Sequence, residues 1–442
     1  MAQPFPLMSL PEEIVQLICR QLSNHRYLDS QTLSFVCRAS KALNRIATPV
    51  LYSRFNSWEK MKKMASFLRS ISLRPELGGY VQEIVFSRFY WFELTEDYLS
   101  IFADVATRLG IDLGSWLEEY PYEAMTQLII AQIPNVKIMD VSTHEVYADD
   151  GVGAFTLLEQ MAAQVPRRVS LHQLQQLTIG HSDIRRISVG YFGGIIELAP
   201  HIRELTISPC YGLYCDEEPK NTRFSLSNVT KLTIDGGHIS KTQLESIVRL
   251  CGQLESFEFK HHTIYAGLQE ISVTPRELIE ILALHKHTLR SISVDLGHRE
   301  RQKTGMFCFS GLCDDGDQIL SLKEFSQLET FKIDGTSVLF PEVANPDYHT
   351  NILVNLLPRS IRHVELIDAQ YESVANMIRL IDSVAKFPFL EEVTLTGNTA
   401  DGRLGEDKVE FDKHELDTLH AMLERNGIML GNDRYQAELN AY

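Results

Sequence analysis

Cysteine and histidine side chains are the first candidates for chemistry in this chain, because both bind zinc. Cys210 and Cys215 have four residues between them, and a second cysteine pair beyond residue 300 has the same spacing. A structural zinc site needs four ligands at tighter, paired spacing, and the only complement close in the sequence is His261-His262. The spacing therefore predicts no metal site.

Calcium, nucleotide and nucleophile motifs are also missing from the sequence. The acidic run at 314–317 lacks the alternating oxygen ligands and the distal glutamate of a calcium loop, so we expect a turn there. The glycine pairs at 193–194 and 236–237 are not followed by the residues of a phosphate-binding loop, and no Gly-x-Ser-x-Gly elbow occurs. We therefore expect no catalytic centre and no cofactor.

Length and composition indicate a folded chain of several units. With 442 residues, 44% hydrophobic and 23% charged, the chain is too long for one small core. The formal charge of −16 disfavours nucleic acid and anionic membrane as partners. No apolar run approaches the ~18 residues of a membrane span. The N-terminus has no secretory pattern, and the seven cysteines fit a reducing compartment, so we expect the cytoplasm and/or the nucleus.

The elements of the first 55 residues are predicted to be three short helices. Ser9 and Glu12 have the spacing of a capping box, and apolar residues then recur with helical periodicity at Ile14, Leu17, Ile18 and Leu22. We expect this apolar face to be covered. A second helix is predicted from a cap at 29–30 and a third up to residue 49, where a proline closes it. A core of this size is marginal, so the module needs a partner.

The apolar pattern of this module resembles an F-box of the fungal kind. The resemblance rests on Leu-Pro-Glu-Glu-Ile at 10–14, Val-Cys-Arg at 36–38 and Pro-Val-Leu-Tyr at 49–52, with leucine or isoleucine between them. F-boxes dock on the Skp adaptor of cullin-RING ubiquitin ligases. By position, the resemblance implies an adaptor-facing or module-supporting set of Leu10, Pro11, Ile14, Ile18, Leu22, Leu33, Val36, Cys37 and Leu51. The alternative is a generic three-helix cap of the segment that follows.

A six-residue pattern recurs along the rest of the chain. Its first, fourth and sixth positions are apolar. Its copies begin at 81, 136, 174, 202, 229, 254, 289, 328, 361 and 390, after a helical bridge over 58–73. The shortest intervals match leucine-rich repeats, and longer intervals indicate insertions. Alternation within each copy predicts a half-buried strand. Capping boxes at Ser240 and Thr274 predict helices between copies.

Strand followed by helix, repeated, predicts a curved α/β solenoid with the strands on its concave side. The predicted fold class is α/β, with a short three-helix F-box before an irregular leucine-rich-repeat-like horseshoe. The predicted domains are 1–55 for the F-box, 56–80 for the helical bridge, 81–430 for the solenoid and 431–442 for a tail. By architecture, nearly the whole chain resembles fungal F-box proteins with degenerate leucine-rich repeats, in which the horseshoe recruits the protein to be ubiquitylated.

Charged residues are expected on the concave face, at the positions that alternate with the buried ones. Three lysines (Lys231, Lys260 and Lys332) are outnumbered there by nine carboxylates: Glu83, Asp140, Glu204, Asp235, Glu258, Asp295, Asp334, Glu365 and Glu392. All of these acids from Glu204 to Glu392, Asp235 included, are predicted to face a substrate. A solvated sheet face is the alternative for each of them. Taken together they favour a partner with a basic segment.

The resemblance implies a non-catalytic substrate receptor. Its F-box would bind the Skp adaptor and, through it, the cullin, while the repeats hold an unknown protein substrate. The alternative is a leucine-rich-repeat interaction scaffold that acts outside a ubiquitin ligase. Co-purification with the cullin distinguishes the two, because the adaptor alone is compatible with both.

Overall fold

The computed structural model describes residues 10–22, 29–57, 61–86, 95–114, 116, 121–143, 155–181, 187–208, 213–214, 225–235, 239–260, 273–295, 319, 321–334, 351–367, 371–396 and 413–431. The chain forms two compact units. The first comprises 1–183 with 190–202 and 222–225, and the second comprises 184–189, 203–221 and 226–442. This division was not predicted from the sequence.

Three helices open the first unit: α1 (Glu12–Leu22), α2 (Asp29–Ala39) and α3 (Lys41–Ser53). The Ser40 hydroxyl caps α3 by accepting a hydrogen bond of 3.1 Å from the amide of Leu43. One prediction was wrong, because Pro49 lies inside α3 and does not end it. Proline removes one helical hydrogen bond, but buried residues on either side, Ala47 and Val50, keep this turn packed.

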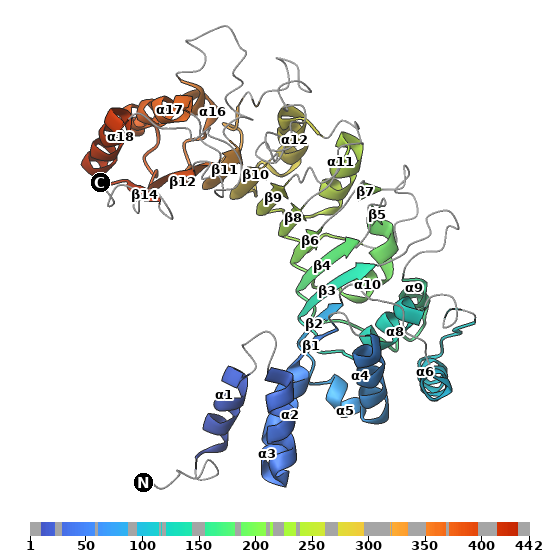
Figure 1. The fold of residues 1–442 in the computed structure, drawn as a ribbon. Coiled ribbons are helices and arrows are strands. Elements are labelled where there is room, and N and C mark those ends of the chain that lie inside the picture. The colour runs from blue at the N-terminus through green and yellow to red at the C-terminus, as the bar shows by residue number, and fades with distance from the viewer. Residues whose placement is uncertain are drawn as a thin grey trace, which may run out of the picture. The chain divides into compact units, whose positions relative to one another are not determined.

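Four parallel strands follow in the first unit: β1 (Arg54–Asn56), β2 (Glu83–Phe86), β3 (Ile138–Thr143) and β4 (Gln176–His181). In Figure 1, α4, α8, α9 and α10 lie along one side of these strands. The bridge predicted over 58–73 is confirmed as α4, and β1 was not predicted. The helices are α4 (Met61–Leu73), α5 (Pro75–Gly78), α6 (Glu96–Leu109), α8 (Pro121–Ile130), α9 (Thr156–Ala163) and α10 (Gly193–Leu198).

Among the described residues of the second unit, eight parallel strands belong to the main sheet, with helices on one side of them (Figure 1). The strands are β6 (Glu204–Ile207), β8 (Lys231–Asp235), β9 (Ser256–Lys260), β10 (Ser291–Asp295), β11 (Thr330–Asp334), β12 (His363–Ile367), β13 (Glu392–Thr396) and β14 (Met429–Gly431). The helices are α11 (Lys241–Leu250), α12 (Pro275–Leu282), α16 (Ile352–Leu356), α17 (Tyr371–Asp382) and α18 (Lys413–Asn426). Two short strands, β5 (Ile187–Ser188) and β7 (Leu213–Tyr214), pair separately.

All ten copies of the six-residue pattern are confirmed as strands, and each strand begins two residues after the copy does. The predicted α/β class is confirmed, with parallel strands in both units. The apolar residues of each copy point into the core, as Phe257 and Phe259 do in β9, while their neighbours are half-buried. The pattern missed β14, because that strand is only three residues long and lacks the full motif.

Strands β8 to β13 each start with a shared backbone acceptor on the preceding repeat. The carbonyl of Thr230 accepts hydrogen bonds from the amides of Glu255 and Ser256, at 2.8 and 3.0 Å. The carbonyl of Glu255 does the same for Arg290 and Ser291. This contact recurs down the second unit, so the start of one repeat fixes the register of the next.

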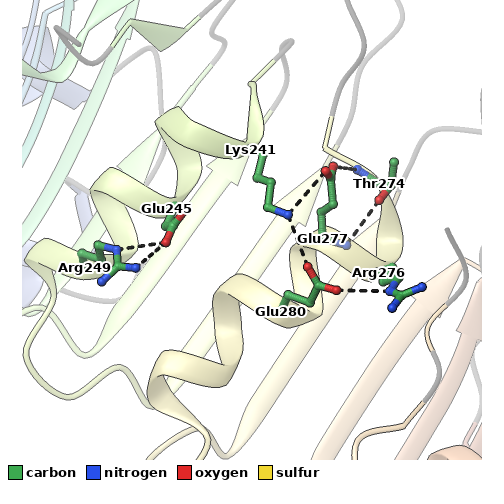
Figure 2. A network of polar contacts seen from close by, with 7 residues as sticks. All are labelled: Lys241, Glu245, Arg249, Thr274, Arg276, Glu277 and Glu280. Carbon is green, nitrogen blue, oxygen red and sulfur yellow. Dashed lines mark hydrogen bonds and ion pairs between the residues drawn. The ribbon is translucent and has the colours of Figure 1, made fainter. Parts of the chain in front are cut away.

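Helices of successive repeats are joined by an ion-pair network on α11 and α12 (Figure 2). Both predicted capping boxes are confirmed, at Ser240 of α11 and Thr274 of α12. The ammonium of Lys241 lies 3.3 Å from Glu280 and 3.6 Å from Glu277, both on α12. Figure 2 shows this lysine reaching across from α11 between the two carboxylates. The network therefore links the first turns of two neighbouring helices.

In the first unit, α9 and α10 approach each other closely at Gly194. A Cβ atom at this position would lie 2.7 Å from the backbone nitrogen of Glu159 and 2.9 Å from the carbonyl carbon of Leu158. Both atoms belong to the backbone, so rotation of a side chain cannot relieve the overlap. The absence of a side chain thus sets the distance between these helices.

We expect Gly194→Ala to lower the free energy of unfolding by about 1 to 2 kcal/mol, because the overlap outweighs the gain in helix propensity. Chemical denaturation of the full chain measures this. Gly79→Ala is the control, since its nearest non-neighbouring atom would be 3.3 Å from the new Cβ and its φ is −67°. Equal effects of the two substitutions would contradict the close-approach argument.

We expect Lys241→Gln to lower the Tm of the chain at low salt, since it removes both contacts from α11 to α12. The loss should shrink in ~1 M NaCl, because exposed ion pairs are screened there. Thermal melts followed by circular dichroism measure it. Glu245→Gln on the same helix, which breaks only the pair with Arg249 inside α11, should have the smaller effect.

Candidate functional site

Helix α1 carries apolar residues on two adjacent faces, and only one of them is buried. Val15 and Cys19 are 1% and 2% exposed, and they pack toward α2 and α3. Ile14, Leu17 and Ile18 are 43%, 52% and 37% exposed. The described part of the chain covers this second face only in part, so its cover by a partner stays a prediction. We call Ile14, Leu17 and Ile18 the α1 stripe.

The interior of the three-helix module explains which face is turned inward. Its core cluster comprises Cys19, Leu33, Cys37, Ala47 and Val50, with Leu22, Val36 and Leu51 packed against it. Burial raises the pKa of the Cys19 thiol, and the thiol of Cys37 adds to this shift. Both cysteines are therefore structural side chains in the resting protein.

The predicted adaptor set is split by the structure into two groups. Pro11, Ile14 and Ile18 are exposed, and Leu10 is half-buried. The remaining five residues form or border the core cluster and so support the module: Leu22, Leu33, Val36, Cys37 and Leu51. The set is thus brought together on one module but not on one surface.

Sequence reasoning left two exposed apolar residues out of the adaptor set. Leu17 shares the helical period of Ile14 and Ile18, so periodicity alone could have included it. Phe35 is 55% exposed and lies between the periodic positions of α2, where the pattern carries no signal. The guanidinium of Arg38 lies 4.8 Å from the centre of the Phe35 ring.

A second candidate surface is the face of the strands opposite the buried core residues. We call it the front face, and its residues are those that alternate with the buried ones along each strand. All nine predicted carboxylates lie at strand positions, from Glu83 in β2 to Glu392 in β13.

Within the described residues, four of the nine front-face carboxylates lie beside a lysine or arginine. Glu83 pairs with Arg54 at 2.8 Å in the first unit. In the second unit the three lysines predicted on this face all have carboxylate partners, at 3.6, 2.8 and 2.7 Å: Lys231 with Glu204, Lys260 with Glu258 and Lys332 with Glu365. The imidazole of His363 lies 3.8 Å from Glu392. Part of the negative charge of this face is therefore balanced by neighbouring cations.

Three further aspartates of the second unit interact with neighbouring groups or are buried. The hydroxyl of Ser208 donates a hydrogen bond of 3.0 Å to Asp235. The Glu258 carboxylate raises the pKa of Lys260 through a hydrogen bond, and the charges of Asp235 and Asp295 add to that shift. Asp334 is only 1% exposed. For this unit, a strongly basic partner stays a prediction with less electrostatic support than the sequence indicated.

Asp140 in β3 is the exception among the nine. No hydrogen bond or ion pair of its carboxylate is present within the described residues. Burial raises its pKa to about 6. Its neighbours across the sheet are Val85 and Thr178, and Ile138 precedes it on the same face with 40% exposure. The chain thus keeps a poorly solvated carboxylate among apolar and hydroxyl side chains.

Metal-binding and membrane-spanning features were sought in the same residues. No group of three or more His, Cys, Asp or Glu side chains in the described segments is arranged to hold a metal ion. No helix there is both long and apolar enough to cross a membrane. The cysteine pairs 210/215 and 308/313, the histidines 261–262 and the acidic run 314–317 lie outside the described residues.

We expect Asp140→Asn to raise the free energy of unfolding at pH 7 to 8. The folded-state pKa lies above the ordinary value of 3.8, so ionisation of Asp140 costs stability as pH rises from about 4 to 6. The full cost above pH 6 is about 1 to 3 kcal/mol, reduced by partial exposure. Denaturation at pH 4 and pH 7.5 measures it.

The difference in the free energy of unfolding between Asp140→Asn and the unchanged chain should vanish near pH 4. Glu83→Gln, which removes the paired carboxylate on the adjacent strand, is the control and should not stabilise the chain. A stabilisation by Asp140→Asn that is equal at both pH values would argue against a desolvated charge.

Comparison with known proteins adds no family to this geometry. No protein-family model matches the chain, and no curated protein matches it either. The functional interpretation therefore depends on the two surfaces themselves, which are the α1 stripe and the front face.

Proposed function

We propose that the chain is a non-catalytic substrate receptor of a Skp-cullin-F-box ubiquitin ligase. In this proposal α1, α2 and α3 form the F-box that binds the Skp adaptor. The strand and helix repeats form an irregular leucine-rich-repeat-like solenoid, whose front face holds a protein substrate. The observation that carries the proposal is the exposed α1 stripe on a module with its own separate core.

The exposure of the α1 stripe supports docking to a protein rather than a role as a cap. A cap of the repeat array would turn its apolar residues toward the array or its own core. Ile14, Leu17 and Ile18 instead form one turn-spanning apolar strip with residues three and four apart. Fully burying each such side chain in an interface contributes about 1.5 to 3 kcal/mol.

The module has a core cluster that does not include the residues of the α1 stripe. The core cluster lies on the other side of α1, and an ion pair of 2.6 Å between Arg45 and Glu12 ties the start of α1 to α3. Contacts inside the module are therefore separate from contacts offered to a partner.

The repeats support the second half of the proposal, recruitment of a protein. Parallel strands with buried alternate residues offer a long row of outward side chains on a rigid support. A receptor of this kind makes no bond itself. It raises the effective concentration of a substrate lysine near the charged conjugating enzyme.

Affinity purification of the full chain, with the Skp adaptor and cullin scored by mass spectrometry, tests the proposal. We expect both proteins with the unchanged chain. Replacing Ile14, Leu17 and Ile18 together by serine should reduce adaptor capture more than about 100-fold, since each lost contact costs roughly 1 to 2 kcal/mol.

The control replaces three exposed apolar residues outside the module by serine: Leu73, Leu284 and Phe389. It should capture adaptor and cullin as the unchanged chain does, and all variants should have the same circular dichroism spectrum. Adaptor without cullin would favour the alternative, a leucine-rich-repeat scaffold that acts outside a ligase. Absence of both from the unchanged chain would overturn the F-box assignment.

A further inference from the structure

Asp140 has an environment unlike that of the paired carboxylates on the front face. Glu83 on the adjacent strand is neutralised by Arg54, whereas nothing in the described chain offers Asp140 a positive charge. Ionised carboxylates in poorly solvated surroundings destabilise a fold unless they are paired. A threonine or asparagine would suit this position of β3 better, so stability does not explain the aspartate.

The side chains around Asp140 are apolar on one flank. Ile138 lies two residues earlier on the same strand face, and Val85 is the cross-strand neighbour. Residues two apart on a strand are about 6.6 to 7 Å apart. This distance suits a side chain that rests an aliphatic stem on Ile138 and places a charged end at Asp140.

We propose that Asp140, Ile138 and Val85 form a subsite for one lysine or arginine side chain of a protein segment lying on the front face of the first unit. The subsite depends on the proposed function in one respect only, which is that the bound segment is taken to belong to the substrate. It replaces the broad expectation of a basic segment with a single cation at a stated position.

The chemistry of the subsite selects this occupant over others. One carboxylate without further oxygen or nitrogen ligands does not hold a metal ion. A nucleic acid would bring negative charge to an aspartate and to a chain with a net charge of −16. The exposed isoleucine also favours a ligand with an apolar stem, which both lysine and arginine have.

Proton release provides an independent signature of the subsite. A bound cation stabilises the ionised form of Asp140, so binding near pH 6 should expel a proton. The charged groups on the same face are Glu83 on the adjacent strand β2 and Arg54 on β1, which pair with each other. Burial raises the pKa of the nearby Tyr122 phenol well above its usual range, so Tyr122 keeps its proton throughout.

The test is binding of the full chain to an array of 12-residue peptides with a Gly-Ser-Val background. One central position carries arginine, lysine, glutamine or norleucine, which keeps the stem but not the charge. At pH 7.5 we expect the arginine and lysine peptides to bind at least 5-fold more tightly than the norleucine peptide. Asp140→Asn should reduce this ratio of affinities below 2-fold. Ile138→Ser should weaken the binding of the arginine, lysine and norleucine peptides alike, because all three have an aliphatic stem.

Glu204→Gln is the matched control, because it removes a front-face carboxylate that is paired with Lys231 in the second unit. It should leave the arginine-to-norleucine ratio unchanged. The ratio for the unchanged chain should also fall between pH 7 and pH 5. An equal ratio for the unchanged chain and Asp140→Asn, or no preference for arginine and lysine at all, would overturn the subsite.

Adaptor capture by the same variants separates this inference from the proposed function. Asp140→Asn should capture the Skp adaptor as the unchanged chain does. If adaptor is captured but the charge preference is missing, the subsite fails and the receptor proposal stands. If the preference is present without adaptor, the subsite stands and the receptor proposal fails.

Discussion

Each strand of the repeats depends on its predecessor for its first backbone hydrogen bonds. The shared carbonyls, such as those of Thr230 and Glu255, accept from two consecutive amides of the next strand. A parallel strand cannot satisfy its own backbone, so no repeat is stable alone. This constraint explains why apolar residues recur at the same positions in copies whose intervening lengths vary widely. It also aligns each outward side chain with the equivalent one in the next repeat.

Alignment of equivalent positions has electrostatic consequences along the second unit. The residue just before each strand alternates in charge over five successive repeats: Glu255, Arg290, Glu329, Arg362 and Glu391. Arg290 contacts Glu329 at 3.3 Å, and Arg362 contacts Glu391. Single exposed pairs of this kind contribute little to stability. As a series they favour the observed order of strands, because a slip by one repeat would place like charges together. The front-face pairs between strands, such as Lys231 with Glu204 and Lys332 with Glu365, follow from the same stacking.

The two candidate surfaces depart from this pattern in opposite ways. On α1, apolar side chains remain exposed although the module already has a core of its own. On β3, a carboxylate remains partly buried although equivalent carboxylates have cations beside them. Both are unfavourable for the isolated chain, and both would become favourable in contact with a partner of matching chemistry. They suggest two separate contacts, an apolar one at α1 and a charged one at β3.

The sequence by itself determined the α/β class, the ten strands with their inward residues and the capped starts of α11 and α12. These features depend on short-range periodicity and capping, which the order of residues encodes directly. Only the tertiary structure decided which face of α1 is buried, because Val15 and Cys19 as well as Ile14 and Ile18 satisfy a helical period. It also decided that Pro49 is tolerated inside α3, that β1 and β14 extend the strands, and that the front-face lysines neutralise carboxylates. The physical reason is that burial and charge pairing depend on neighbours distant in the sequence, so a list of residue types cannot show which carboxylates have a cation beside them.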